Sequence, residues 1–253
     1  MKKIKWYHIV SLVLVLFLVL FILSAVFSFY GNPVTKTIAS SGIRKYVEEA
    51  YPNMNLEVSE TGYNFKFDEY ISHVQSKDST DTNFTVRWEA GNITDTYEED
   101  VINCWNTYER LQREFSKVLE EMIAREFPYE TSMVFGDFGR KGEGINGLEL
   151  DMPLDLKKLP IPATLTIYFF GREINYELFK ERFLEISAIM ERHEIDISYY
   201  NVVMQEPQED GEKPKPDGQS IHLFDYPAQR LASEKLVDDI KEHIARWEKE
   251  HEK

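Results

Sequence analysis

The feature that most constrains the fold is an uncharged apolar run of 22 residues near the N-terminus, residues 9–30. At about 1.5 Å per residue, a helix of this length crosses a hydrocarbon layer about 30 Å thick. Trp6 and Tyr7 precede the run, and Phe29 and Tyr30 close it. Aromatic rings of this kind prefer the headgroup level of a bilayer. The run therefore predicts a transmembrane helix that anchors the chain through residues 9–30.

Two alternatives exist for such a run, a core helix of a soluble protein and a cleaved signal peptide. A core helix rarely extends this far without a charge, and the apolar part of a signal peptide is typically about 7–15 residues long. Large phenylalanines surround the small residues Val26 and Ser28, where cleavage would be expected. The only cysteine is Cys104, so lipoprotein processing after the run is excluded. An uncleaved anchor is the favoured interpretation.

Basic residues predict how the anchor is oriented. Lys2, Lys3 and Lys5 crowd its N-terminal side, whereas the three basic residues after its other end, Lys36, Arg44 and Lys45, lie further out. Because the more basic flank stays in the cytoplasm, we expect a single-pass protein of the cell membrane with a cytoplasmic N-terminus. The two C-terminal domains would then be extracytoplasmic.

The part of the chain after the anchor is strongly acidic. The chain has 29 Lys and Arg against 44 Asp and Glu, and removing the three N-terminal lysines leaves 26 against 44. This charge repels a nucleic-acid backbone and an anionic lipid surface. We therefore expect no nucleic-acid partner. A single cysteine also excludes an internal disulfide and a cysteine-rich metal site.

Hydrophobic periodicity predicts a first α+β domain over residues 31–128. An apolar face with helical spacing predicts a helix over residues 34–51, after the breakers Gly31-Asn32-Pro33. A longer stripe predicts a second helix over 98–127, which Pro128 ends. Alternating apolar residues between the helices predict three strand-like stretches: 55–67, 70–74 and 84–88.

The remaining residues, 129–253, predict a second α+β domain. Strands are expected at 133–138, 147–151, 163–170, 197–204 and 221–224, and helices at 176–193 and 233–250. This order predicts an antiparallel sheet with helices on one face. The expected fold class is α+β: a cytoplasmic stub and transmembrane helix (1–30), then two small two-layer domains whose antiparallel sheets are covered by helices.

One stretch matches a nucleotide-binding string, G-x-G-x-x-G at residues 142–147. A dinucleotide site needs that turn to open a helix, so that free amides face the pyrophosphate. Here alternating residues follow and lead to Pro153, so we interpret the stretch as a flexible turn. We expect no nucleotide ligand.

Other chemistry-bearing residues are scattered along the chain. The acids Asp78, Asp81 and Asp95 lie near the expected start of the long helix, where capping and solvation explain them better than Ca²⁺ binding. Cys104 is expected to be a core or boundary thiol. No histidine pair has metal-binding spacing, so surface or strand positions are expected for all six: His8, His73, His193, His222, His243 and His251. We therefore assign no catalytic residue, no cofactor and no metal ligand.

Three short motifs stand out after the anchor: Gly31-Asn32-Pro33-Val34, Tyr51-Pro52 and Gly62-Tyr63-Asn64-Phe65-Lys66-Phe67. Together they resemble the YfjL-like family, and the remainder of the chain resembles it in element order more than in motif. The resemblance implies an N-terminal membrane helix and an uncharacterised protein of Gram-positive bacteria. The family offers no established activity or catalytic residue to transfer, so the resemblance bears on location and architecture.

Three hypotheses for the function follow. The first is a binding or interaction module of the cell envelope, with no enzymatic activity, that contacts another envelope protein, a peptide or the wall. The second is an envelope enzyme that uses dispersed carboxylates such as Asp78, Asp81 and Asp95. The third is a structural assembly protein without a ligand. Since the sequence contains no catalytic constellation, we favour the first.

Overall fold

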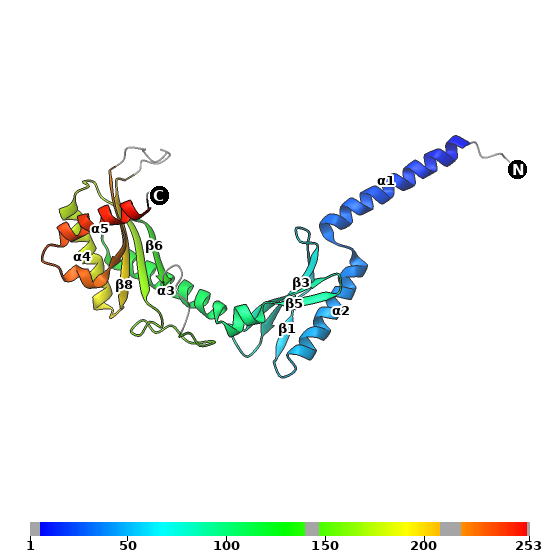
Figure 1. Cartoon of the computed structure of the whole chain (residues 1–253), viewed down its shortest axis with the longest axis horizontal. Coiled ribbons are helices and arrows are strands. Elements are labelled where there is room, and N and C mark those ends of the chain that lie inside the picture. The colour runs from blue at the N-terminus through cyan, green and yellow to red at the C-terminus, as the bar shows by residue number, and fades with distance from the viewer. Residues whose placement is uncertain (1–5, 140–146, 208–218, 252–253) are drawn as a thin grey trace. The chain divides into compact units, whose positions relative to one another are not determined.

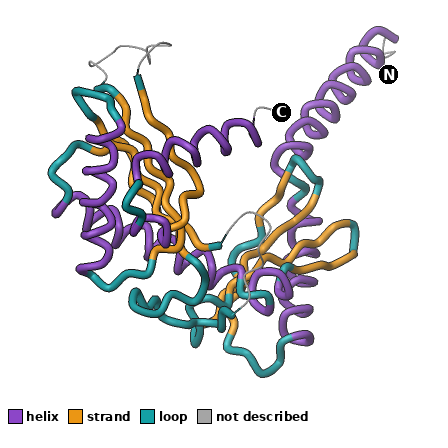
Figure 2. The backbone as a smooth tube through the Cα atoms, turned by 60° about the vertical axis from the view of Figure 1, so that its left-hand side comes forward, coloured by secondary structure: helices purple, strands orange, loops and turns teal. Residues whose placement is uncertain are grey.

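The computed structural model describes residues 6–139, 147–207 and 219–251 and confirms the α+β class. The chain divides into two compact units, Met1–Asn106 and Thr107–Lys253. Figure 1 labels the elements of both units, and Figure 2 separates helices from strands by colour. Each unit has its own sheet and its own apolar core.

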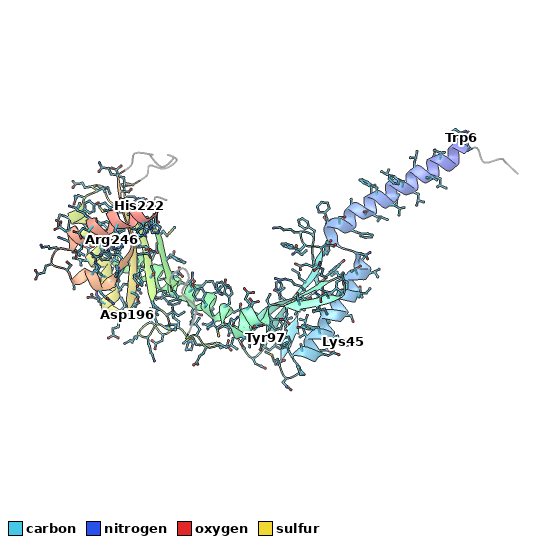
Figure 3. The ribbon with its side chains drawn as sticks, in the orientation of Figure 1. Trp6, Lys45, Tyr97, Asp196, His222 and Arg246 are labelled. Carbon is cyan, nitrogen blue, oxygen red and sulfur yellow. The ribbon has the colours of Figure 1, made fainter. Side chains whose placement is uncertain are left out.

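The first helix, α1 (Trp6–Tyr30), contains the whole apolar run. Its described side chains are exposed, from Trp6 at its N-terminal end onward (Figure 3). Within the described residues it is the one helix long and apolar enough to cross a membrane. A water-exposed surface of this composition is unfavourable, so the helix is compatible with membrane anchoring.

The first unit packs the helix α2 (Pro33–Ala50) on a five-stranded antiparallel sheet. The strands are β1 (Leu56–Val58), β2 (Gly62–Asn64), β3 (Glu69–Ser76), β4 (Asn83–Glu89) and β5 (Asn92–Asp95). Both β1 and β2 pair with β3, and β4 and β5 follow in order. Ile43 and Val47 of α2 pack on Val74, Phe84 and Val86 of the sheet. Polar side chains such as His73 and Arg87 occupy the opposite, exposed face.

A close junction joins α1 to this unit. Gly31 has φ +74°, and a Cβ there would lie 2.7 Å from Tyr63 Cγ and 2.9 Å from the Tyr70 hydroxyl. Only glycine fits this left-handed, crowded position. The backbone amide of Asn32 donates to the Tyr70 hydroxyl (2.8 Å), and this hydroxyl donates to the backbone carbonyl of Asn32 (3.0 Å). The Asn32 side chain also caps α2 by accepting from the amide of Val34 (2.8 Å).

The second unit has a four-stranded sheet in the order β6-β7-β8-β9. Its strands are β6 (Thr131–Phe138), β7 (Ala163–Phe170), β8 (Ile197–Gln205) and β9 (Ser220–Pro227). The helices α3 (Trp105–Glu126) and α4 (Tyr176–Arg192) cover one face, and α5 (Leu236–His251) packs beside β9 and contacts α4. The short 3₁₀ segment η2 (Ala228–Ala232) links β9 to α5. One face of this sheet is therefore a helix-covered core.

The apolar face of α3 belongs to this second core. Leu111, Phe115 and Leu119 are fully buried in it. A Cβ on Gly136 of β6 would lie 2.6 Å from Phe115 Cδ1, and the Ser116 hydroxyl donates to the Gly136 carbonyl (2.7 Å). The sequence places the domain boundary at residue 128, whereas the compact units divide after residue 106, because α3 packs on the sheet that follows it.

Several local features differ from the sequence-based expectation. The stretch expected as one strand over 55–67 forms two short strands, β1 and β2, and the strand β5 was not predicted. The long helix begins at Trp105, because Cys104 adopts φ +55° after a short π-helical segment, η1 (Glu98–Ile102). The strand expected at 147–151 is absent, since Gly147 and Asp151 have positive φ. The pair β7–β8 is parallel, because the crossover helix α4 returns the chain to the same end of the sheet. The other strand pairs are antiparallel, as expected.

Candidate functional site

The face of the second sheet opposite α3 and α4 is lined with polar groups. On β7, the side chains of Leu165 and Ile167 are buried in the core, while Thr164 and Thr166 point to the other face. The neighbouring strands continue this face, since Thr164 pairs with Asp137 of β6 and Thr166 with Asn201 of β8. Hydroxyl, amide and carboxylate groups therefore lie side by side on three strands.

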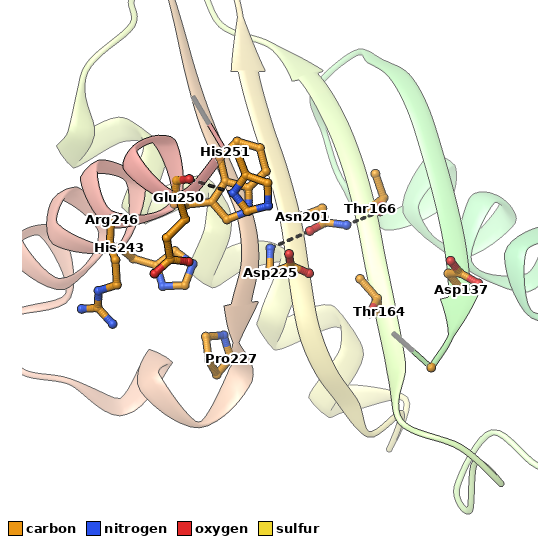
Figure 4. Close-up of a pocket in the computed structure, with 12 residues that line it drawn as sticks. Asp137, Thr164, Thr166, Asn201, Asp225, Pro227, His243, Arg246, Glu250 and His251 are labelled. Atoms are coloured by element: carbon orange, nitrogen blue, oxygen red, sulfur yellow. Dashed lines mark hydrogen bonds between the residues drawn. The ribbon is translucent and has the colours of Figure 1, made fainter. Parts of the chain in front are cut away.

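A pocket of about 570 Å³ lies on this face (Figure 4). The strand residues form its floor, and the C-terminal half of α5 borders it. The lining residues are Asp137, Gly139, Thr164, Thr166, Asn201, Asp225, Pro227, His243, Arg246, Trp247, Glu250 and His251. The volume is sufficient for a small ligand or a few residues of a peptide.

Asn201 fixes the centre of the floor. Its amide nitrogen donates to the Thr166 hydroxyl (2.9 Å), and its oxygen accepts from the backbone amide of Asp225 (2.8 Å). Asp225 adopts φ +52° next to an irregularity in the β8–β9 pairing. Bulges of this kind change the direction in which a side chain points. Here the carboxylate of Asp225 lines the pocket.

The pocket has an acidic character. Its described lining residues include three carboxylates, from β6, β9 and α5, and one guanidinium, that of Arg246. Asp137 Oδ1 accepts from its neighbour's amide, Phe138 N (2.8 Å), and from the Tyr108 hydroxyl (3.2 Å). Burial, followed by the charge of Asp137, raises the pKa of Tyr108 to about 12, so this hydroxyl stays protonated as a donor. The arrangement favours a cationic ligand group over an anionic one.

The wall contributed by α5 is held in place by His243 and Trp247. His243 Nε2 donates to the carbonyl of Phe224 (2.8 Å), and its Nδ1 accepts from Arg230 (3.3 Å). Burial lowers the pKa of His243, so the ring is neutral at neutral pH and adds no charge to the pocket. The Trp247 ring packs on Phe224, with the centroids 4.9 Å apart, and stacks on His251 at 4.1 Å.

A second cluster of titratable groups lies in the first unit around Asp95. Its Oδ2 accepts from the Tyr46 hydroxyl (2.5 Å) and the Tyr51 hydroxyl (2.8 Å), and its Oδ1 accepts from the Tyr97 amide (3.0 Å). Both tyrosines have a raised pKa. The largest cause is the hydrogen bond to Asp95 for Tyr46 and burial for Tyr51. The rings of Tyr51, Phe84 and Tyr97 pack together at 4.7–5.1 Å. This cluster closes the edge of the first core.

The structure does not bring the three candidate acids Asp78, Asp81 and Asp95 together. Asp78 and Asp81 share the β3–β4 connection, where Asp78 accepts from the Asn55 amide (3.2 Å) and Asp81 is 2% exposed. Asp95 lies on β5, opposite Val86 of β4. In the described part of the chain, no group of three or more histidines, cysteines or acids is placed to hold a metal ion.

Among the other sequence candidates, His243 and His251 line the pocket described above, and the following residues make local contacts. His73 Nδ1 lies 3.2 Å from the Thr85 hydroxyl, and His193 Nε2 lies 2.5 Å from a Glu126 oxygen. Cys104 is partly exposed, and its thiol contacts the Ile102 carbonyl (3.8 Å). The stretch 142–147 lies outside the described residues except for Gly147.

Sequence reasoning missed the pocket. One signal was present: in residues 163–170, the threonines at 164 and 166 alternate with leucine and isoleucine. Such alternation is typical of a strand with one core face and one polar face. The convergence of Asp137, Asp225 and Glu250 depends on strand order and on the placement of α5, which the linear pattern does not encode.

Family models match most of the chain. Residues 3–100 match the model for the YfjL-like N-terminal domain, and residues 114–241 match the model for the YfjL-like C-terminal domain. The two matched ranges agree with the two compact units of the structure. No curated protein and no solved structure matches the chain.

Proposed function

We propose that this chain, which belongs to the YfjL-like family, is a single-pass membrane protein with an extracytoplasmic binding module. The two α+β units then have a binding role in the cell envelope and carry out no catalytic step. The helix α1 supports the anchoring, since its exposed apolar surface needs a lipid environment. Lys2, Lys3 and Lys5 support a cytoplasmic N-terminus.

The observation that carries the binding role is the acidic pocket of the second unit. Asp137, Asp225 and Glu250 come from three separate elements and line one open polar face. A face of this kind suits a cationic segment of a peptide or envelope protein, whose Lys or Arg side chains would pair with the carboxylates while its amides bond to Thr166 and Asn201. The acidic balance of the whole extracytoplasmic part would attract the same partner at longer range.

A peptide-binding assay tests this role. The full-length protein in detergent is titrated with a fluorescent lysine-rich peptide and with a glutamate-rich peptide of the same length, and binding is followed by anisotropy. We expect only the basic peptide to bind, and we expect added salt to weaken its binding. The double variant Asp137→Asn, Asp225→Asn should weaken binding about tenfold or more, since a charged hydrogen bond contributes roughly 1.5–3 kcal/mol.

The matched control removes the same charge elsewhere. Glu177 and Glu181 lie on α4, which covers the opposite face of the sheet, and both are exposed. The double variant Glu177→Gln, Glu181→Gln should bind the basic peptide nearly as well as the unmodified protein. Equal weakening by both double variants would show that bulk charge alone attracts the peptide, and the pocket would lose its assigned role.

A further inference from the structure

The turn between β2 and β3 exposes two large aromatic side chains. Phe65 is 62% exposed and Phe67 is 61% exposed, with Lys66 between them. The turn is nevertheless well defined: the Phe67 amide donates to the Asn64 carbonyl (3.2 Å), and the Tyr63 hydroxyl donates to Asp68 (2.7 Å). A well-defined turn that presents two neighbouring phenylalanines to the exterior is suited to an apolar partner.

This turn lies against the C-terminal half of α1. The Phe65 ring is 5.8 Å from the Phe29 ring. A groove of about 630 Å³ separates the two elements and is lined by Leu20, Leu23, Ser24, Phe27, Ser28, Tyr63, Phe65 and Asp68. At about 1.5 Å per residue, Leu20 lies roughly 15 Å along the helix from Tyr30. The turn therefore stands beside a part of α1 that is inside the bilayer when α1 spans it.

Further apolar side chains are exposed at the same end of the unit. Val34 and Ile38, on the first turns of α2, are 66% and 58% exposed. Both follow the Gly31-Asn32 junction directly, so they lie close to the point where α1 ends. The Lys66 ammonium lies 5.3 Å from the centre of the Phe67 ring. Two aromatic rings beside a long basic side chain are suited to the membrane–water interface, because the rings can enter the lipid while the ammonium group extends to the headgroups.

We propose that the β2–β3 turn, residues 65–68, is a second membrane-contact site that inserts Phe65 and Phe67 into the leaflet at the C-terminal end of α1. This site rests on the anchoring role proposed for α1. The ligand is the lipid interface itself, and the groove between α1 and the turn accommodates an acyl chain. Insertion is driven by apolar burial, so it does not require anionic lipid, in keeping with the acidic balance of the unit.

Spin labelling of the full-length protein in phosphatidylcholine vesicles tests the site. Each variant carries Cys104→Ser and one new cysteine: Lys66→Cys in the turn, Leu16→Cys in α1, or Thr80→Cys in the exposed β3–β4 connection. Since β3 has eight residues at about 3.3 Å each, Thr80 lies some 25 Å from the turn along the strand. The readout is the accessibility of each label to oxygen, which partitions into lipid, relative to a water-soluble nickel chelate.

The expected result is an oxygen-to-nickel ratio at position 66 that is severalfold above that at position 80 and below that at position 16. Adding Phe65→Ser and Phe67→Ser should lower the ratio at position 66 to that of position 80, which shows that the rings rather than the label enter the lipid. A ratio at position 66 equal to that at 80, with position 16 in lipid, overturns the contact site and leaves the anchor intact. A water-accessible position 16 overturns the anchor and the contact site together.

Discussion

The Asp95 carboxylate holds the hydroxyls of Tyr46 and Tyr51 at the edge of the first core. Both tyrosines have a raised pKa in the folded protein, so folding favours their protonated form. This contribution to stability is complete below about pH 10, the ordinary tyrosine pKa, and is lost as the pH rises above it. We predict that Tyr51→Phe lowers the free energy of unfolding at neutral pH by about 1–2 kcal/mol and makes the alkaline decline shallower.

Urea unfolding measured between about pH 8 and pH 11 tests this prediction. The other three tryptophans are replaced by phenylalanine, so that Trp88 is the only fluorescent tryptophan. Trp88 packs against the same core, and its fluorescence reports the unfolding of that core. Tyr168→Phe removes a hydroxyl from the second sheet and serves as the control, with no effect on the Trp88 transition. An unchanged alkaline slope in Tyr51→Phe would contradict the role of the Asp95 cluster.

At the scale of elements, the close contact of α3 with β6 determines which core the helix stabilises. A Cβ at Gly136 would lie 2.6–2.8 Å from Phe115 and Leu119, which are fully buried and have little room to move. We predict that Gly136→Ala destabilises the second unit by about 1–3 kcal/mol through overpacking. Hydrogen exchange should increase in α3 and the β6–β9 sheet and stay unchanged in the β1–β5 sheet.

The glycine control lies in the first unit. A Cβ at Gly62 would be 3.9 Å from Ile71, an ordinary contact, so Gly62→Ala should leave exchange in both sheets nearly unchanged. If Gly136→Ala instead loosened the strands β1–β5, then α3 would contribute to the first core, as the sequence-based boundary at residue 128 implies.

At the scale of the whole molecule, the orientation proposed for α1 determines on which side of the membrane both units would act. We predict that a membrane-impermeant maleimide labels a Thr80→Cys, Cys104→Ser variant in intact cells, whereas a Lys3→Cys, Cys104→Ser variant reacts only after permeabilisation. Replacing Lys2, Lys3 and Lys5 by glutamine should give a mixed population, because the basic residues closest to the helix are removed while Lys36, Arg44 and Lys45 remain on its other side. Labelling of position 80 only in permeabilised cells would reverse the proposed topology.

Local sequence patterns predicted most of the helices and strands. The features that they did not predict depend on packing between segments that are far apart in the sequence. The 22-residue run, the helix after Pro33 and the strand at 163–170 follow from hydropathy and periodicity alone. The parallel pair β7–β8 and the assignment of α3 to the second core depend on contacts between distant segments, such as Phe115 on Gly136. The pocket was missed for the same reason, since Asp137, Asp225 and Glu250 are far apart in the sequence.

The tight junction at Asn32 has a mechanical consequence. Only two residues separate the end of α1 at Tyr30 from the start of α2 at Pro33, and Tyr70 binds both backbone groups of Asn32. Two extended residues span at most about 7 Å, so no long flexible linker separates α1 from the rest of the first unit. With α1 in a membrane, as proposed, the first unit cannot sample a wide volume beside that membrane, and a pulling force on the unit is transmitted directly to α1.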